Sequence, residues 1–126
     1  MSEYNLHKAV VMYINMKYPK ALYHSDLSGV KMSMGTIRKM AALNKYRGFP
    51  DLILYEKNMK YIGLVMELKK EGSSPFKKNG ELKSSEHLDN QVFWLNHLAK
   101  LGFKTSFVVG VPEAIKTIDD YFNNKL

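Results

Sequence analysis

Apolar residues recur along this chain at two spacings, one typical of helices and one typical of buried strands. Helical spacing predicts helices over residues 3–17 and 36–45, a third from Ser84 or Ser85 to about 101, and a last one opening at Pro112. Ser2 is the expected N-cap of the first helix. In the last helix, three apolar residues are expected to face inward: Ile115, Ile118 and Phe122.

Strand patterns are expected at residues 21–24, 52–55, 61–68 and 104–109. The second and third are apolar at nearly every position, which predicts that both faces of the sheet are covered. Residues 25–29 read as a turn, and residues 71–83, rich in Gly, Ser, Pro and Asn, read as a loop. The predicted order is α-β-α-β-β-α-β-α, an α/β fold in one domain over residues 1–126.

Composition narrows the possible partners. The chain has 126 residues, 45% of them hydrophobic, which is enough for one domain with a core. Its 19 Lys and Arg against 12 Asp and Glu favour an anionic partner such as nucleic acid, although many basic proteins bind none. The lack of cysteine excludes disulfides and cysteine-based zinc sites. Without a signal-like or membrane-length apolar run, we expect a soluble cytoplasmic protein that does not bind membranes.

Two short motifs, Pro50-Asp51 and Glu67-Leu68-Lys69, flank the predicted hairpin of residues 52–68. If the turn centres near Met59, Asp51 lies opposite Glu67. Alternate residues of a strand share a face, so Glu67 and Lys69 point to the same side. The two carboxylates and the lysine are therefore expected to converge at one end of the hairpin.

Two adjacent carboxylates repel each other unless a cation lies between them. Magnesium prefers oxygen ligands and often binds through one or two carboxylates with water and substrate phosphate. We expect Asp51 and Glu67 to bind Mg²⁺ with the backbone carbonyl of Leu68, and Lys69 to act on the water or the phosphate. The alternative is a salt bridge at a strand end, with Asp51 as a turn residue.

Gln91 and Glu3 are two further candidates for this site. The helical neighbours of Gln91 include Leu88 and Leu95, so its amide is expected to be buried and to need hydrogen-bond partners. Nearby backbone could satisfy it, but we favour a side chain directed into the site. Glu3 could add a carboxylate from the first helix, or could only complement the helix dipole.

With these motifs the chain resembles the PD-(D/E)XK nuclease superfamily and, more narrowly, the small stand-alone form of the VRR-NUC domain (virus-type replication-repair nuclease). The resemblance covers nearly the whole chain. Its matching positions are Glu3, residues 47–52, residues 66–69, Gln91 to Leu95, Leu98 and Gly102. It implies a restriction-endonuclease-like core, in which a central mixed β-sheet is flanked by helices.

The resemblance also implies an activity. Asp51, Glu67, Lys69 and Gln91 would be catalytic, with Glu3 completing the metal site. The expected function is a Mg²⁺-dependent endodeoxyribonuclease of DNA repair, with Mn²⁺ able to substitute, acting as a homodimer on branched DNA such as Holliday junctions. It would work in the host cytoplasm if phage-encoded. His7 departs from the glutamine that often follows the first-helix acid, and we expect it to support the site rather than to bind metal.

Two basic groups flank the motifs. Phosphate contacts are expected from eight residues: Arg38, Lys39, Lys45, Arg47, Lys70, Lys77, Lys78 and Lys83. A solvated lysine loop is nearly as good an account of residues 71–83. The alternatives are a less selective nickase or restriction-like nuclease, and a non-catalytic nucleic-acid-binding module. Three apolar residues are candidates for a dimer interface: Tyr61, Phe103 and Tyr121.

Overall fold

The computed structural model describes residues 1–26 and 32–126, and its elements follow the predicted order. In chain order these are α1 (Glu3–Lys17), β1 (Tyr23–Ser25), α2 (Met34–Leu43), β2 (Leu52–Leu54), β3 (Leu64–Lys69), α3 (Glu86–Leu101), β4 (Lys104–Val109) and α4 (Gly110–Phe122). The expected α/β class is thus confirmed. The predicted turn at residues 25–29 lies partly outside the described residues.

The four strands form one mixed sheet in the order β1-β2-β3-β4. β1, β2 and β3 pair antiparallel, whereas β3 and β4 pair parallel across the connection that contains α3. Leu52 pairs with Met66, which is the register that places Asp51 opposite Glu67. The sequence-based hairpin geometry is therefore confirmed.

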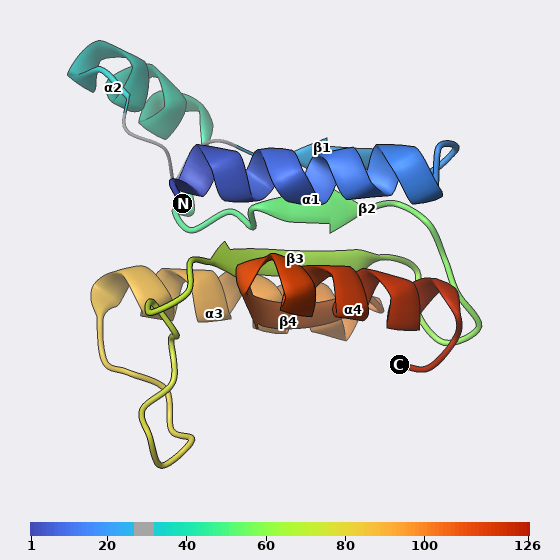
Figure 1. Ribbon diagram of the computed structural model, residues 1–126. Helices are drawn as coiled ribbons and strands as arrows, with labels where there is room; N and C mark the ends of the chain where they lie inside the picture. The colour runs from blue at the N-terminus through green and yellow to red at the C-terminus, as the bar shows by residue number, and fades with distance from the viewer. Residues whose placement is uncertain (27–31) are drawn as a thin grey trace.

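Helices cover both faces of the sheet, so the central strands are buried on both sides (Figure 1). α1 and α4 pack on one face, in a core that includes Val10, Leu64 and Ile118. α3 packs on the other face, where Leu95 contacts Ile53 and Val65. This two-sided cover explains why β2 and β3 are apolar at nearly every position.

Local sequence signals determine where the helices begin and end. The Ser2 hydroxyl accepts a hydrogen bond from the Asn5 N–H at 3.1 Å and caps α1, as predicted. Ser85 caps α3 through the Leu88 N–H, and Gly102, with a φ of 114°, ends that helix. The strand β3 begins later than expected. The Asn58 side chain accepts hydrogen bonds from two backbone N–H groups, and Gly63 packs closely under the Phe103 ring.

Of the three candidates for a dimer interface, Tyr121 was wrong. Tyr121 is fully buried and donates a hydrogen bond to the Glu56 carbonyl at 2.6 Å. Tyr61 and Phe103 are partly buried and pack against the two cores. The buried face of α4 is formed by Ala114, Ile118 and Tyr121, so Ile115 and Phe122 lie only at its edge.

α2 differs from the other helices because none of its residues is buried. It projects from one end of the molecule, above the end of the sheet at which β3 terminates (Figure 1). Within the described residues, no helix is both long and apolar enough to cross a membrane.

Candidate functional site

The two motifs meet at the end of the β2–β3 pair. Asp51 directly precedes β2, and Glu67 and Lys69 lie at the end of β3. Gly48 brings the chain into this position: its φ is +89°, and a Cβ there would lie 2.7 Å from the Asn90 backbone. Only glycine allows the segment before Asp51 to pass this close to α3.

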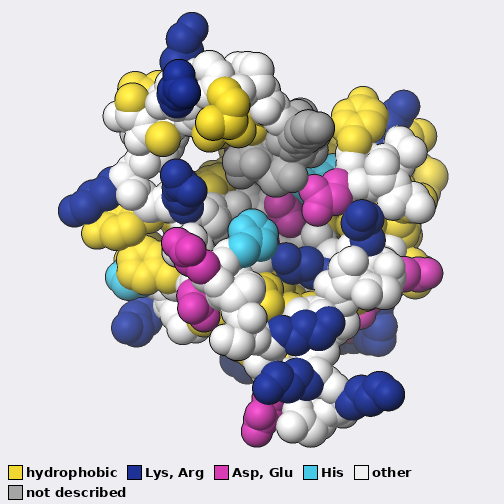
Figure 2. All heavy atoms as spheres, turned by 90° about the vertical axis from the view of Figure 1, so that its left-hand side faces the viewer, with side chains coloured by type: hydrophobic (Ala, Val, Ile, Leu, Met, Phe, Trp, Pro, Cys, Tyr) yellow, Lys and Arg dark blue, Asp and Glu magenta, His cyan; other side chains and the backbone are white. Residues whose placement is uncertain are grey.

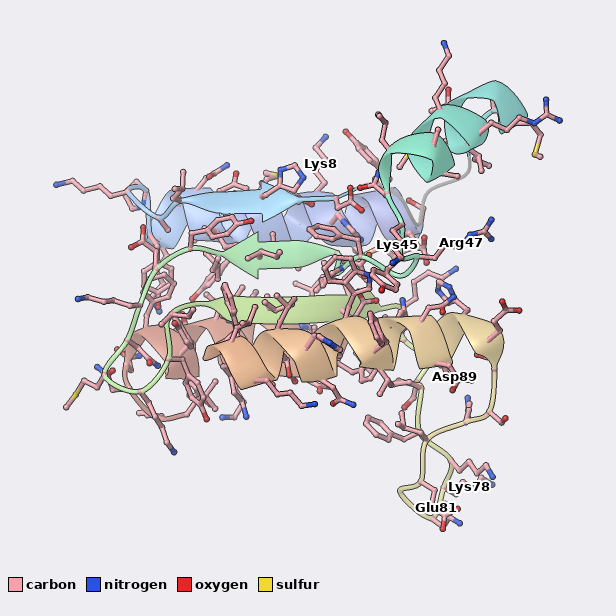
Figure 3. All side chains as sticks on the ribbon, turned by 180° about the vertical axis from the view of Figure 1, so that it is seen from behind. Lys8, Lys45, Arg47, Lys78, Glu81 and Asp89 are labelled. Atoms are coloured by element: carbon pink, nitrogen blue, oxygen red, sulfur yellow. The ribbon has the colours of Figure 1, made fainter. Side chains whose placement is uncertain are left out.

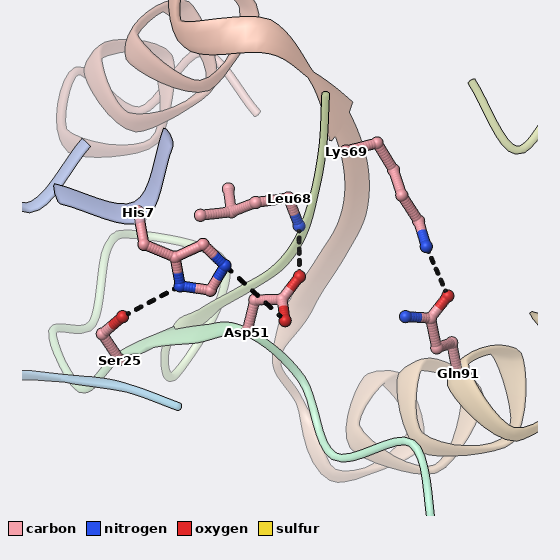
Figure 4. A network of polar contacts seen from close by, with 6 residues as sticks. All are labelled: His7, Ser25, Asp51, Leu68, Lys69 and Gln91. Carbon is pink, nitrogen blue, oxygen red and sulfur yellow. Dashed lines mark hydrogen bonds and ion pairs between the residues drawn. The ribbon is translucent and has the colours of Figure 1, made fainter. Parts of the chain in front are cut away.

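Asp51 is held by a backbone contact to the opposite strand. Its Oδ2 accepts a hydrogen bond from the Leu68 N–H at 2.8 Å (Figure 4). The N–H and C=O of one strand residue point toward the same neighbouring strand. The Leu68 carbonyl is therefore directed to the same side as Asp51.

Glu67 is fully buried, and neither of its carboxylate oxygens has a hydrogen-bond partner among the described residues. Burial raises the pKa of Glu67, and repulsion from the adjacent Asp51 raises it further. Burial also raises the pKa of Asp51, against the opposing effect of the Leu68 hydrogen bond. The positive charge of Lys69 opposes both shifts without outweighing them, so a bound cation would further stabilise the ionised pair.

Lys69 and Gln91 form the third part of the site. The Lys69 Nζ donates a hydrogen bond to the Gln91 Oε1 at 2.8 Å (Figure 4). Gln91 is buried on α3, as expected, and its amide is directed toward Lys69. The parallel register between β3 and β4 places Lys69 beside Val109, at the same end of the sheet.

His7 supports Asp51 from the opposite side. Its Nδ1 lies 3.3 Å from the Ser25 hydroxyl, and its Nε2 lies 3.8 Å from the Asp51 Oδ1 (Figure 4). Burial lowers the pKa of His7, although Glu3 and Asp26 act to raise it. A buried, neutral imidazole in this position fits the expected supporting role.

An open cleft of about 470 Å³ leads to these residues. Its lining includes Asp51, Lys69 and Gln91, whereas Glu67 lies fully buried. Glu3 is exposed at the mouth of the cleft. Within the described residues, no three acidic or histidine side chains converge on one point, so a third ligand would have to come from backbone, water or a moved Glu3.

The predicted phosphate-binding residues lie on two sides of this end of the molecule (Figure 2). Arg38 and Lys39 lie on α2, with Lys45 and Arg47 in the segment that follows it. The other group lies at the end of β3 and in the loop after it, and consists of Lys70, Lys77, Lys78 and Lys83. Acidic side chains are visible between the two basic groups (Figure 2).

Sequence reasoning missed two neighbours of the site. Ser25 contacts His7 because the register of β1 places it opposite Leu52, and no sequence signal fixes that register. Tyr46 lines the cleft after α2, and its position between Lys45 and Arg47 was the available signal. Asp26, interpreted earlier as a turn residue, also lines the cleft.

Among the comparisons with known proteins, the comparison of folds is the informative one. No protein-family model and no curated protein matches the chain. A solved structure named "VRR_NUC domain protein" superposes on it with a TM-score of 0.69. The match covers 98% of this chain and 89% of that one, at 20% sequence identity. The chain therefore shares the fold of this VRR_NUC domain protein, a mixed sheet flanked by helices.

Proposed function

We propose that the protein is a metal-dependent endonuclease that hydrolyses phosphodiester bonds in DNA. The observation that carries this proposal is the fully buried Glu67 carboxylate, which lacks a hydrogen-bond partner among the described residues and is close enough to Asp51 to be repelled by it. A buried carboxylate without a partner destabilises a fold, so its presence needs a compensating role. The name of the structurally similar protein, a VRR-NUC domain protein, supports the same activity.

The oxygen donors fit a magnesium ion. Asp51, Glu67 and the Leu68 carbonyl supply hard ligands on one side, and the cleft leaves room for water and phosphate on the other. Mn²⁺, which also suits oxygen ligands, is expected to substitute. Bound metal would lower the pKa of a water molecule and offset the charge of the phosphate. Glu3 is close enough to the cleft to contribute through a water.

The remaining residues position and charge the site. Gln91 holds the Lys69 side chain in the cleft, where its positive charge can stabilise the negative charge that develops on the phosphate. The Leu68 N–H fixes the orientation of the Asp51 carboxylate, and the buried His7 imidazole lies beside it. In these roles, Asp51, Glu67, Lys69 and Gln91 form the catalytic set.

DNA is the proposed substrate because cationic groups lie on both sides of the cleft (Figure 2). Lys and Arg contacts to phosphates provide affinity without sequence preference. We propose that branched DNA, such as a Holliday junction, is preferred and that two copies act as a homodimer, since a two-fold protein matches a two-fold junction. A cytoplasmic location is proposed on the cysteine-free composition.

The test is cleavage of labelled four-way junction, flap and linear duplex DNA with Mg²⁺, with Mn²⁺ and with chelator. We expect metal-dependent cleavage that is lost in Asp51→Asn. Asp120→Asn is the matched control, since Asp120 lies on α4 and pairs with Lys116. Cleavage that persists in Asp51→Asn, or that ignores chelator, contradicts the mechanism.

The same assay separates the alternative functions. Equal cutting of linear duplex and junctions would indicate a less selective nickase or restriction-like nuclease. Binding without cleavage under any divalent metal would indicate a nucleic-acid-binding module. Sedimentation at several protein concentrations tests the homodimer independently of the activity.

A further inference from the structure

Three exposed aromatic rings form a continuous row beside the cleft. The Tyr46 and Phe93 ring centroids are 5.0 Å apart with an interplanar angle of 36°, and those of Phe93 and His97 are 4.4 Å apart at 38°. Tyr46 is 50% exposed and Phe93 is 38% exposed. These rings contribute little to the core, so their contact with one another calls for another explanation.

The fold connects this row to the candidate active site. Phe93 and His97 lie one turn apart on α3, the helix that also carries Gln91. Tyr46 lies in the segment between α2 and β2 and lines the cleft with Asp51 and Lys69. The row therefore starts at the cleft and continues along the outer side of α3.

Basic side chains lie near Tyr46, the member of the row that lines the cleft. The Lys45 Nζ lies 5.2 Å from the centroid of the Tyr46 ring. Figure 3 places Lys45 and Arg47 between α2 and α3, and Asp89 on the opposite side of α3. An anionic chain that contacted the rings would thus meet lysine and arginine on one side.

We propose that Tyr46, Phe93 and His97 form a stacking platform for unpaired nucleotides next to the scissile phosphate. Aromatic rings together with basic side chains are the usual way to hold single-stranded nucleic acid without sequence preference. The proposal rests on the proposed nuclease function and refines its substrate: among branched DNAs, it favours flaps and other branches with a single-stranded segment at the cleavage point over fully paired four-way junctions.

Binding without cleavage tests the platform directly. Fluorescence anisotropy in the presence of chelator compares a labelled single-stranded oligothymidine with a blunt duplex of equal length. Phe93→Ala is expected to weaken single-strand binding about tenfold and duplex binding by less than about twofold. Phe93→Tyr is expected to retain wild-type affinity, and Phe93→Leu, which keeps an apolar side chain, is expected to behave like Phe93→Ala.

Tyr55→Ala is the matched control. Tyr55 is a 48% exposed aromatic residue at the end of β2 remote from Asp51. This variant is expected to bind both probes as the wild type does, and circular dichroism checks that each variant is folded.

Several results would overturn the proposal. These are unchanged single-strand affinity in folded Phe93→Ala, equal loss for both probes, or wild-type affinity in Phe93→Leu. Dissociation of a dimer by Phe93→Ala with unchanged DNA binding would instead assign the row to contacts between two copies. Since the binding assay needs no metal, absence of cleavage would count against the proposed function and leave the binding result to decide the platform.

Discussion

Two carboxylate clusters in this protein have opposite electrostatic character. At the junction of α1 and α4, Asp119 accepts hydrogen bonds from Tyr13 and Tyr18 at 2.6–2.7 Å and pairs with Lys17 at 3.2 Å. Burial acts to raise the pKa of Asp119, but these partners outweigh it and lower that pKa. At the end of the β2–β3 pair, Glu67 lacks hydrogen-bond partners among the described residues, and its pKa is raised.

The ionised form of Asp119 stabilises the fold, whereas the ionised form of Glu67 destabilises it. The ionised form of Asp119 is favoured by its neighbours, so it contributes to stability at neutral pH. Ionised Glu67 is disfavoured by burial and by Asp51, so the rest of the fold must offset its cost. Such a cost is expected where charge serves binding or catalysis.

The largest expected effect is on the rate of DNA cleavage, which should depend on Glu67 and not on Asp119. Glu67→Gln should lower the rate of DNA cleavage at least about a thousandfold, because it removes a charged metal ligand. Asp119→Asn should leave the rate within about twofold. Initial rates on a labelled junction at saturating Mg²⁺ measure both, and comparable losses in the two variants would remove the distinction.

Metal addition should give the next largest effect. Mg²⁺ at about one hundred times its dissociation constant should raise the free energy of unfolding of the wild type by about 2.7 kcal/mol. Asp119→Asn should show the same increase and Glu67→Gln almost none. Thermal melts with and without Mg²⁺ test this, and an equal response from all three proteins would place the metal elsewhere.

Without metal, Glu67→Gln is expected to be more stable than the wild type, by a smaller amount than the metal effect. Glu67→Gln at pH 7 should raise the free energy of unfolding by about 1–2 kcal/mol, because burial raises the pKa of Glu67 to about 9 and the metal-free wild type must therefore take up a proton to fold. The folded-state pKa of Glu67 lies above its ordinary 4.5, so the wild type loses stability as pH rises above that value. The gain should therefore vanish near pH 4, as urea unfolding from pH 4 to 8 would show.

Asp119→Asn should give the smallest effect and the reverse pH dependence. The loss at pH 7 should be about 1 kcal/mol, since the cluster is partly exposed and solvent screens it. The pKa of Asp119 lies below its ordinary 3.8, so its stabilisation is present above that pH and disappears as pH falls through the folded-state pKa. If Asp119→Asn were more stable than the wild type at pH 7, ionised Asp119 would not stabilise the fold.

Local sequence patterns predicted much of the fold, and they predicted that the main candidate residues lie close together. Apolar spacing and caps gave the order of elements and the exact bounds of α1, because Ser2 and Pro19 are local signals. The hairpin register followed from centring the connection near Met59, and so did the pairing of Asp51 with Glu67. Gln91 was predictable because helical spacing alone puts it on the buried face.

Other features depend on contacts between distant segments. The burial of Tyr121 depends on the hydrogen bond to Glu56, which no periodicity reveals. The contact between His7 and Ser25 needs the β1 register, and the row from Tyr46 to His97 needs the packing of the post-α2 segment against α3. Such long-range placements are not determined by local spacing.

The mixed sheet has a consequence for the order of folding. β3 meets β2 through a short hairpin, but it meets β4 only after the long connection through α3 has closed. Hairpins form in microseconds, whereas non-local parallel pairing is slower. Asp51 and Glu67 should therefore approach each other before α3 brings Gln91 to Lys69. If so, a divalent cation should speed folding more than it slows unfolding, which stopped-flow refolding would detect.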